Sequence, residues 1–69
     1  MNDNIKFEIA KETISTMIAL VTNEGYSPDS DIMRKLLEEK QQINEYNQDV
    51  IDMVIEEYAP IIKNGGING

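Results

Sequence analysis

The chain has 69 residues, which is one small domain, and its 13 acidic against 6 basic side chains give a formal net charge of −7. It has no cysteine and no histidine, so a disulfide framework, a cysteine-type zinc site and histidine-based catalysis are excluded. The few basic side chains argue against binding to nucleic acid, because such binding draws most of its affinity from cations on phosphates. No apolar run reaches the ~20 residues that span a bilayer, and no signal peptide is recognisable. We therefore expect a cytoplasmic protein.

A first helix is predicted over about residues 5–23. Asp3 or Asn4 can cap its start, and Gly25 supplies the left-handed residue that helices commonly use just past their last turn. The apolar residues recur at spacings of mostly three and four, as on one face of a helix: Ile5, Ile9, Ala10, Ile14, Met17, Ile18 and Val21.

A second helix is predicted over about residues 28–41. Ser27 can cap it, and Pro28 suits the first helical position, where a missing N–H has no cost. The aliphatic stem of Lys40 can extend the inner face of this helix. That face is formed by Ile32, Met33, Leu36 and Leu37.

A third helix is predicted over about residues 48–58, after a polar connector at 42–46. Asn47 caps it, and Pro60 ends it, because the residue before a proline resists helical geometry. The stripe of this helix consists of Val50, Ile51, Val54, Ile55 and Tyr58. Residues 64–69 have little to bury and are expected to be a disordered tail. The sequence thus predicts an all-α, three-helix domain.

Residues 17–21 of the first helix are apolar in an unbroken run, so they point all the way around it. Two short helices can cover one side of such a segment but hardly all of it. One explanation is that Ile61 and Ile62 fold back and complete the core. The other, which we favour, is that the helix docks in a groove of another protein. The docking face would then carry Thr13, Met17, Leu20 and Val21.

Glu24 stands at the end of this helix, on the same face as Leu20, which lies four residues before it. A carboxylate that an apolar helix carries into the cleft of a partner needs a cation there, most plausibly an arginine. From physical chemistry alone, an ordinary solvated glutamate remains the simpler interpretation of Glu24.

The run from Glu24 to Asp29, behind one apolar helix and ahead of two more, resembles the VbhA-like antitoxins that inhibit Fic-domain toxins. The resemblance extends from about Thr13 to Tyr58 and includes the Glu24–Gly25 helix end, the Pro28–Asp29 pair and the segment Asp49-Val50-Ile51. It implies three helices that wrap a Fic protein. It also implies that Glu24 pairs with an active-site arginine, takes the place of the γ-phosphate of ATP and so blocks adenylylation.

The inhibitory motif of these antitoxins has Ser or Thr four residues before the glutamate, and here that position is Leu20. Thr22 lies nearly opposite on the helix, and Thr16 lies two turns away from Glu24, so neither can replace the missing hydroxyl. One net hydrogen bond is worth ~1 kcal/mol, which is small beside the cost of breaking a buried charge pair.

Two other functions stay open: a generic helical binding or regulatory module that docks through the first helix, and a free-standing structural domain. Enzyme activity is the least favoured, because the sequence has no phosphate-binding glycine loop and no recognisable metal motif. We therefore predict no catalytic residue, no metal, no cofactor, no small-molecule substrate and no membrane or nucleic-acid partner.

Overall fold

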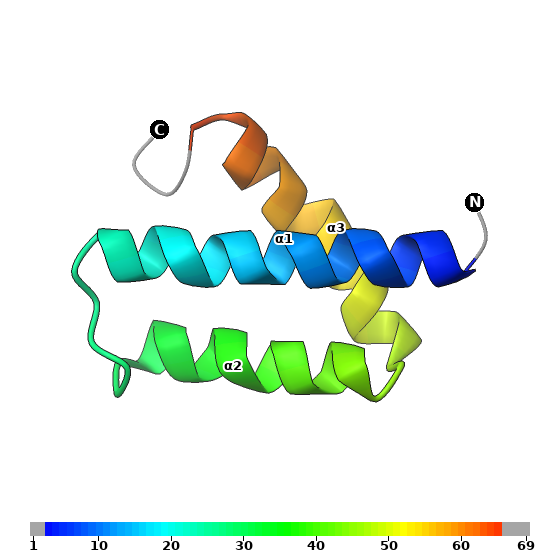
Figure 1. Cartoon of the computed structure of the whole chain (residues 1–69), viewed down its shortest axis with the longest axis horizontal. Helices are drawn as coiled ribbons and strands as arrows, with labels where there is room; N and C mark the ends of the chain where they lie inside the picture. The colour runs from blue at the N-terminus through cyan, green and yellow to red at the C-terminus, as the bar shows by residue number, and fades with distance from the viewer. Residues whose placement is uncertain (1–2, 66–69) are drawn as a thin grey trace.

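The computed structural model describes residues 3–65, and these form three helices: α1 (Asp3–Asn23), α2 (Asp31–Asn44) and α3 (Gln48–Lys63). The predicted all-α, three-helix fold is confirmed. In Figure 1, α1 and α2 lie side by side and run in opposite directions, while α3 crosses α1 obliquely. Both α2 and α3 pack mainly on α1, and they contact each other much less. The longest helix is therefore the centre of the fold.

The core consists of apolar side chains that all three helices contribute. Six of the buried side chains are large and almost completely removed from water, and each contributes roughly 1.5–3 kcal/mol through burial. They are Ile14, Val21, Leu36, Ile43, Ile51 and Val54. Every one belongs to a predicted stripe except Ile43, which the sequence analysis placed in a connector.

The helix α1 ends at the predicted residue, Asn23, but it begins earlier than predicted. The helix begins at Asp3, so it includes both residues suggested as its caps, Asp3 and Asn4. At the other end Gly25 has a φ of 95°. The Gly25 N–H donates to the Thr22 carbonyl at 3.0 Å and the Tyr26 N–H donates to the Val21 carbonyl at 3.3 Å, the paired bonds of a Schellman motif.

The predicted start of α2 is wrong by three residues, because the cap is Ser30 and not Ser27. The Ser30 N–H and hydroxyl both donate to the Ser27 carbonyl, at 3.1 and 2.8 Å. Pro28 therefore occupies the second position of a turn, another place that suits its fixed φ. The Ser30 hydroxyl in turn accepts from the Met33 N–H at 3.4 Å, as an N-cap does.

The far end of α2 is also later than predicted, at Asn44, and the extra turn buries Ile43. The helix stops at a second Schellman motif, in which Tyr46 has a φ of 62°. The Tyr46 N–H donates to Ile43 and the Asn47 N–H to Gln42. A non-glycine residue in this conformation costs about 1–2 kcal/mol. The inner face of α2 carries Glu39, whereas Lys40, expected to extend that face, is exposed.

The helix α3 passes through Pro60, where it was expected to stop, and ends at Lys63. A proline inside a helix costs about 3 kcal/mol through its lost hydrogen bond and its ring. The turn beyond it packs Ile61 and Ile62 against the core, and that burial offsets the cost. Asn47 is the N-cap as predicted, but its side chain makes no capping bond.

Asn64 and Gly65, where the disordered tail was expected to begin, instead form a turn that closes α3. The Gly65 N–H donates to the Ile62 carbonyl at 3.1 Å, and Gly65 has a φ of 98°. The rest of the predicted tail, 66–69, lies outside the described residues.

The apolar run at 17–21 is covered largely by the chain itself. Met17 and Val21 are buried, Ile18 and Leu20 are half-buried against the core, and Ala19 is exposed. Ile61 and Ile62, in the turn that follows Pro60, pack against the same core, in line with the explanation that the sequence analysis ranked second.

Candidate functional site

The candidate site lies where α1 ends and the chain turns towards α2. Glu24 is the last residue to make a helical backbone bond, from its N–H to the Leu20 carbonyl at 3.0 Å, and Gly25 then reverses the chain. Glu24 is exposed. A Cβ built on Gly25 meets no atom within 4 Å. The glycine is therefore required by its backbone conformation and not by lack of space.

The electrostatics of this helix end disfavour an acidic residue. The carbonyl end of a helix carries a partial negative charge, and an acid beside it costs about 0.3–1 kcal/mol. The last turn of α1 contains no basic residue to offset that charge. Glu45 holds the equivalent position at the end of α2, where the last turn likewise has no basic residue. The two glutamates thus share one backbone setting.

Three of the four residues predicted to contact a partner are buried by contacts within the chain. Thr13, Met17 and Val21 are 8%, 4% and 0% exposed, so in this conformation they face the other helices. Leu20 is half-buried and packs against the core from its edge. Docking through the full set would need the helices to separate, and Leu20 alone is accessible without such a change.

The two hydroxyls nearest to the missing motif position are bonded to the backbone of α1. Thr16 donates to the Glu12 carbonyl at 2.9 Å, and Thr22 donates to the Ile18 carbonyl at 2.8 Å. The structure thus places neither hydroxyl beside Glu24, and the motif position holds the aliphatic side chain of Leu20.

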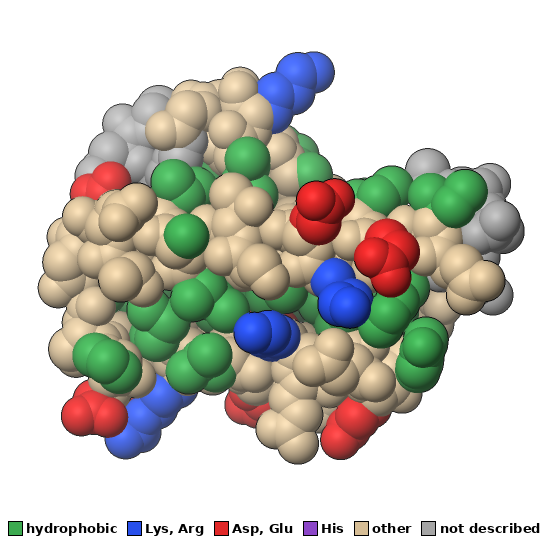
Figure 2. Space-filling model, in the orientation of Figure 1, with side chains coloured by type: hydrophobic (Ala, Val, Ile, Leu, Met, Phe, Trp, Pro, Cys, Tyr) green, Lys and Arg blue, Asp and Glu red, His purple; other side chains and the backbone are tan. Residues whose placement is uncertain are grey.

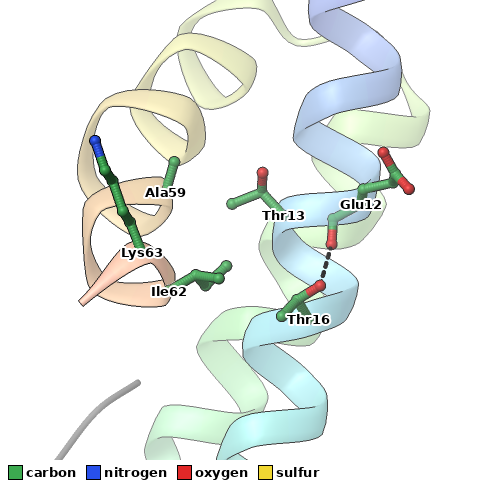
Figure 3. A pocket seen from close by; sticks show the side chains of 6 residues that line it. All are labelled: Glu12, Thr13, Thr16, Ala59, Ile62 and Lys63. Atoms are coloured by element: carbon green, nitrogen blue, oxygen red, sulfur yellow. Dashed lines mark hydrogen bonds between the residues drawn. The ribbon is translucent and has the colours of Figure 1, made fainter. Parts of the chain in front are cut away.

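An open groove of about 340 Å³ lies between α1 and the last turns of α3. In Figure 3, Thr13 and Ile62 point towards each other across it, whereas the charged ends of Glu12 and Lys63 point outward. Its lining residues are Glu12, Thr13, Thr16, Ala59, Ile62 and Lys63. Sequence reasoning did not find this groove, because it treated α3 as ending before Ala59.

The groove and Glu24 lie on the same side of α1. At 100° per residue, Thr13, Leu20 and Glu24 fall within about 40° of one another around the helix axis. Thr13, which lines the groove, therefore lies on the same side of α1 as Leu20 and Glu24.

A buried polar contact links α2 to α3, and the sequence analysis did not identify it. The Tyr58 hydroxyl donates to Glu39 Oε1 at 2.6 Å, and Glu39 is only 9% exposed. Burial, reinforced by the Glu39 carboxylate, raises the pKa of Tyr58 well above its usual range. The sequence spacing could have indicated that Glu39 is buried, because it lies three residues after Leu36 and four before Ile43, on the inner face of α2.

Two other kinds of site are absent from the described part of the chain. Residues 3–65 hold no cluster of three or more acidic side chains that could bind a metal ion. Within the same range, no helix has both the length and the apolar character needed to cross a membrane. Comparison with family models, curated proteins and solved structures finds no match to this chain.

Proposed function

We propose that this chain is an antitoxin that binds a Fic-domain toxin and blocks adenylylation with Glu24. In this proposal the Glu24 carboxylate pairs with the arginine of the toxin that would otherwise hold the γ-phosphate of ATP. Gly25 lets the chain turn away at once, so that the carboxylate can enter a cleft ahead of the rest of the molecule. The chain itself carries out no reaction.

The observation that carries the proposal is the position of Glu24. It projects from an exposed helix tip, next to a glycine in the left-handed conformation, and at the helix end where its charge is unfavourable. A carboxylate exposed at such a tip can meet a cation that a partner protein supplies. The resemblance of the run from Glu24 to Asp29 to VbhA-like antitoxins supplies the identity of that cation.

The test replaces Glu24 with glutamine, which preserves shape and removes charge. The cognate toxin is expected in a neighbouring reading frame, with a His-Pro-Phe segment followed by Gly-Asn-Gly-Arg. The Glu24→Gln complex should still assemble and should regain adenylylation, measured as transfer of labelled AMP from ATP. Loss of a buried charge partner costs ~3–5 kcal/mol, or roughly two to nearly four orders of magnitude in inhibition.

The matched control is Glu45→Gln, which removes the same charge from the equivalent backbone position at the end of α2. This variant should inhibit as well as the original chain. The mechanism is refuted by a Glu24→Gln complex that stays inhibited, or by equal loss of inhibition in the two variants.

The groove between α1 and α3 supports a second candidate, a helical binding module that docks along this face without blocking an active site. Thr16 is exposed and lines the groove, so Thr16→Arg fills it without disturbing the core. For a pure docking module, Thr16→Arg abolishes binding of the partner and Glu24→Gln changes nothing. For the antitoxin, Glu24→Gln abolishes inhibition within an intact complex.

A further inference from the structure

The groove between α1 and the last turns of α3 contains a buried hydroxyl that the chain leaves unbonded. Thr13 lines this groove and is only 8% exposed, and its hydroxyl forms no hydrogen bond within the described residues. No side-chain oxygen or nitrogen in residues 3–65 is both sealed from solvent and unpaired, so the Thr13 oxygen reaches solvent at the groove. A hydroxyl in such a setting gains from a partner, because burial of a polar group without a hydrogen bond is costly.

The other two threonines of α1 show a different arrangement. Thr16 and Thr22 each donate to the carbonyl four residues before them, at 2.9 and 2.8 Å. This bond is common for threonine inside a helix. Thr13 does not form it with the Ile9 carbonyl, which is the corresponding acceptor. Its hydroxyl is therefore left able both to donate and to accept.

The groove around Thr13 has an apolar wall and a rim of opposite charges. Ala59 and Ile62 supply the wall from α3, and Ile62 points towards Thr13 (Figure 3). Glu12 stands on the α1 side and Lys63 on the α3 side, and neither forms an ion pair within the described residues. In Figure 2 a basic side chain rises from the end of α3 at the top of the view, and acidic side chains lie on α1 below it. An apolar centre inside a polar rim is typical of a contact between proteins.

We propose that this groove binds an extended segment of a protein partner, in which one apolar side chain is flanked by a basic and an acidic one. The apolar side chain packs against Ala59 and Ile62, and a backbone group of the segment bonds to the Thr13 hydroxyl. The basic side chain meets Glu12, and the acidic side chain meets Lys63. This inference rests on the second candidate function, docking at this groove, and makes no use of Glu24.

An extended segment fits these contacts better than a helix does. The backbone N–H and C=O groups of an isolated extended segment are unpaired, so one of them can bond to the Thr13 hydroxyl, whereas those inside a helix bond to each other. Alternate side chains of an extended segment point to the same face. Three residues at spacings of two therefore present a cation, an apolar group and an anion to the groove together.

The test titrates the folded chain with two pentapeptides of the same composition, acetyl-Lys-Gly-Val-Gly-Glu-amide and acetyl-Glu-Gly-Val-Gly-Lys-amide, and follows methyl signals by NMR. The methyl groups of Thr13, Ala59 and Ile62 should shift more than those of Ile5 and Leu37, which are exposed and do not line the groove. One peptide should bind more tightly, because the two rim charges lie on different helices. Equal binding of both peptides, or groove shifts no larger than the control shifts, overturns the proposal. A response only to a longer alanine-rich helix that carries the same three side chains four residues apart also overturns it.

A second experiment tests the role of the buried hydroxyl. Thr13→Val removes the hydroxyl, keeps the shape of the side chain and breaks no hydrogen bond of the described residues. It should weaken binding of the preferred peptide about two- to tenfold while the melting temperature holds. The matched control is Thr16→Val, because Thr16 also lines the groove but its hydroxyl is already bonded to the Glu12 carbonyl. This control should bind nearly as well as the original chain. A Thr13→Val chain that binds as tightly as the original contradicts the proposal.

A third experiment tests the rim charges. Glu12→Lys combined with Lys63→Glu exchanges the two charges and keeps the net charge of the chain, so the preferred peptide order should reverse. An unchanged preference refutes the roles assigned to these two residues. Glu24→Gln should leave peptide binding unchanged, so failure of the peptides to bind would refute the groove assignment without touching the test of inhibition by Glu24.

Discussion

The hydrogen bond from Tyr58 to Glu39 joins the two helices that contact each other least, α3 and α2. Tyr58→Phe removes this hydroxyl and nothing else, so it leaves a carboxylate that is 9% exposed without that donor. The 2.6 Å separation is typical of a charge-assisted O–H···O⁻ bond. The variant therefore tests whether a buried polar link sets the position of α3.

The expected loss follows from the charge on the acceptor. Hydrogen bonds to charged groups contribute about 1.5–3 kcal/mol, and a buried carboxylate that loses its donor pays the desolvation cost as well. We expect Tyr58→Phe to lower the free energy of unfolding by about 2 kcal/mol. For a domain of this length, whose net stability is only ~3–5 kcal/mol, a loss of that size should lower the melting temperature by roughly 10 °C.

The assay is urea unfolding followed by circular dichroism, applied to Tyr58→Phe, Glu39→Met and the double variant. Replacing both partners with apolar groups of similar shape is close to neutral, so the double variant should be more stable than Tyr58→Phe alone. The reasoning is refuted by a Tyr58→Phe variant within ~0.5 kcal/mol of the original chain, the usual range of inconsequential surface changes. It is equally refuted by a double variant whose loss equals the sum of the single losses, because distant, independent sites add in this way.

Two further predictions concern the backbone at the candidate site and the response to pH. Gly25→Ala should destabilise the chain by about 1–2 kcal/mol in the same unfolding assay; because no atom lies within 4 Å of the added Cβ, a much larger loss would mean that space and not backbone conformation requires the glycine. Since burial raises the pKa of Tyr58, the unfolded chain loses this proton first as the pH rises above about 10. Stability is therefore fully present below that pH and falls above it, and Tyr58→Phe should remove this part of the alkaline loss.

The helices themselves could be predicted from the sequence, but not all their ends. The apolar spacings identified most of each stripe, although Ile5 and Leu37, which they included, are 49% and 46% exposed. Gly25 defined the end of α1. At the start of α2, Ser27 and Ser30 both qualify as caps, and local chemistry does not choose between them. At the end of α3, Pro60 is overridden by the burial of Ile61 and Ile62, which depends on where α1 lies in space.

Only the part of the candidate site that is formed by residues adjacent in the sequence could be predicted. The Glu24–Gly25 tip depends on a few consecutive residues, and the structure has the helix end where the sequence placed it. The groove depends on the crossing of α1 and α3, which no sequence spacing encodes. Leu20 and Val21 illustrate the difference: both belong to the apolar run, yet only the packing shows that Val21 is completely buried and that Leu20 remains at the edge.

The link between Tyr58 and Glu39 also bears on binding, because Tyr58 directly precedes the turns of α3 that line the groove. A link that fixes those turns keeps the groove formed in the unbound chain. Binding of a partner would then lose less conformational entropy. Glu24 does not depend on this arrangement, since its position is set by the backbone of α1 and by Gly25. If the chain is the antitoxin proposed above, loosening α3 should therefore weaken binding at the groove while leaving the Glu24 carboxylate in place, and affinity and inhibition would be separable.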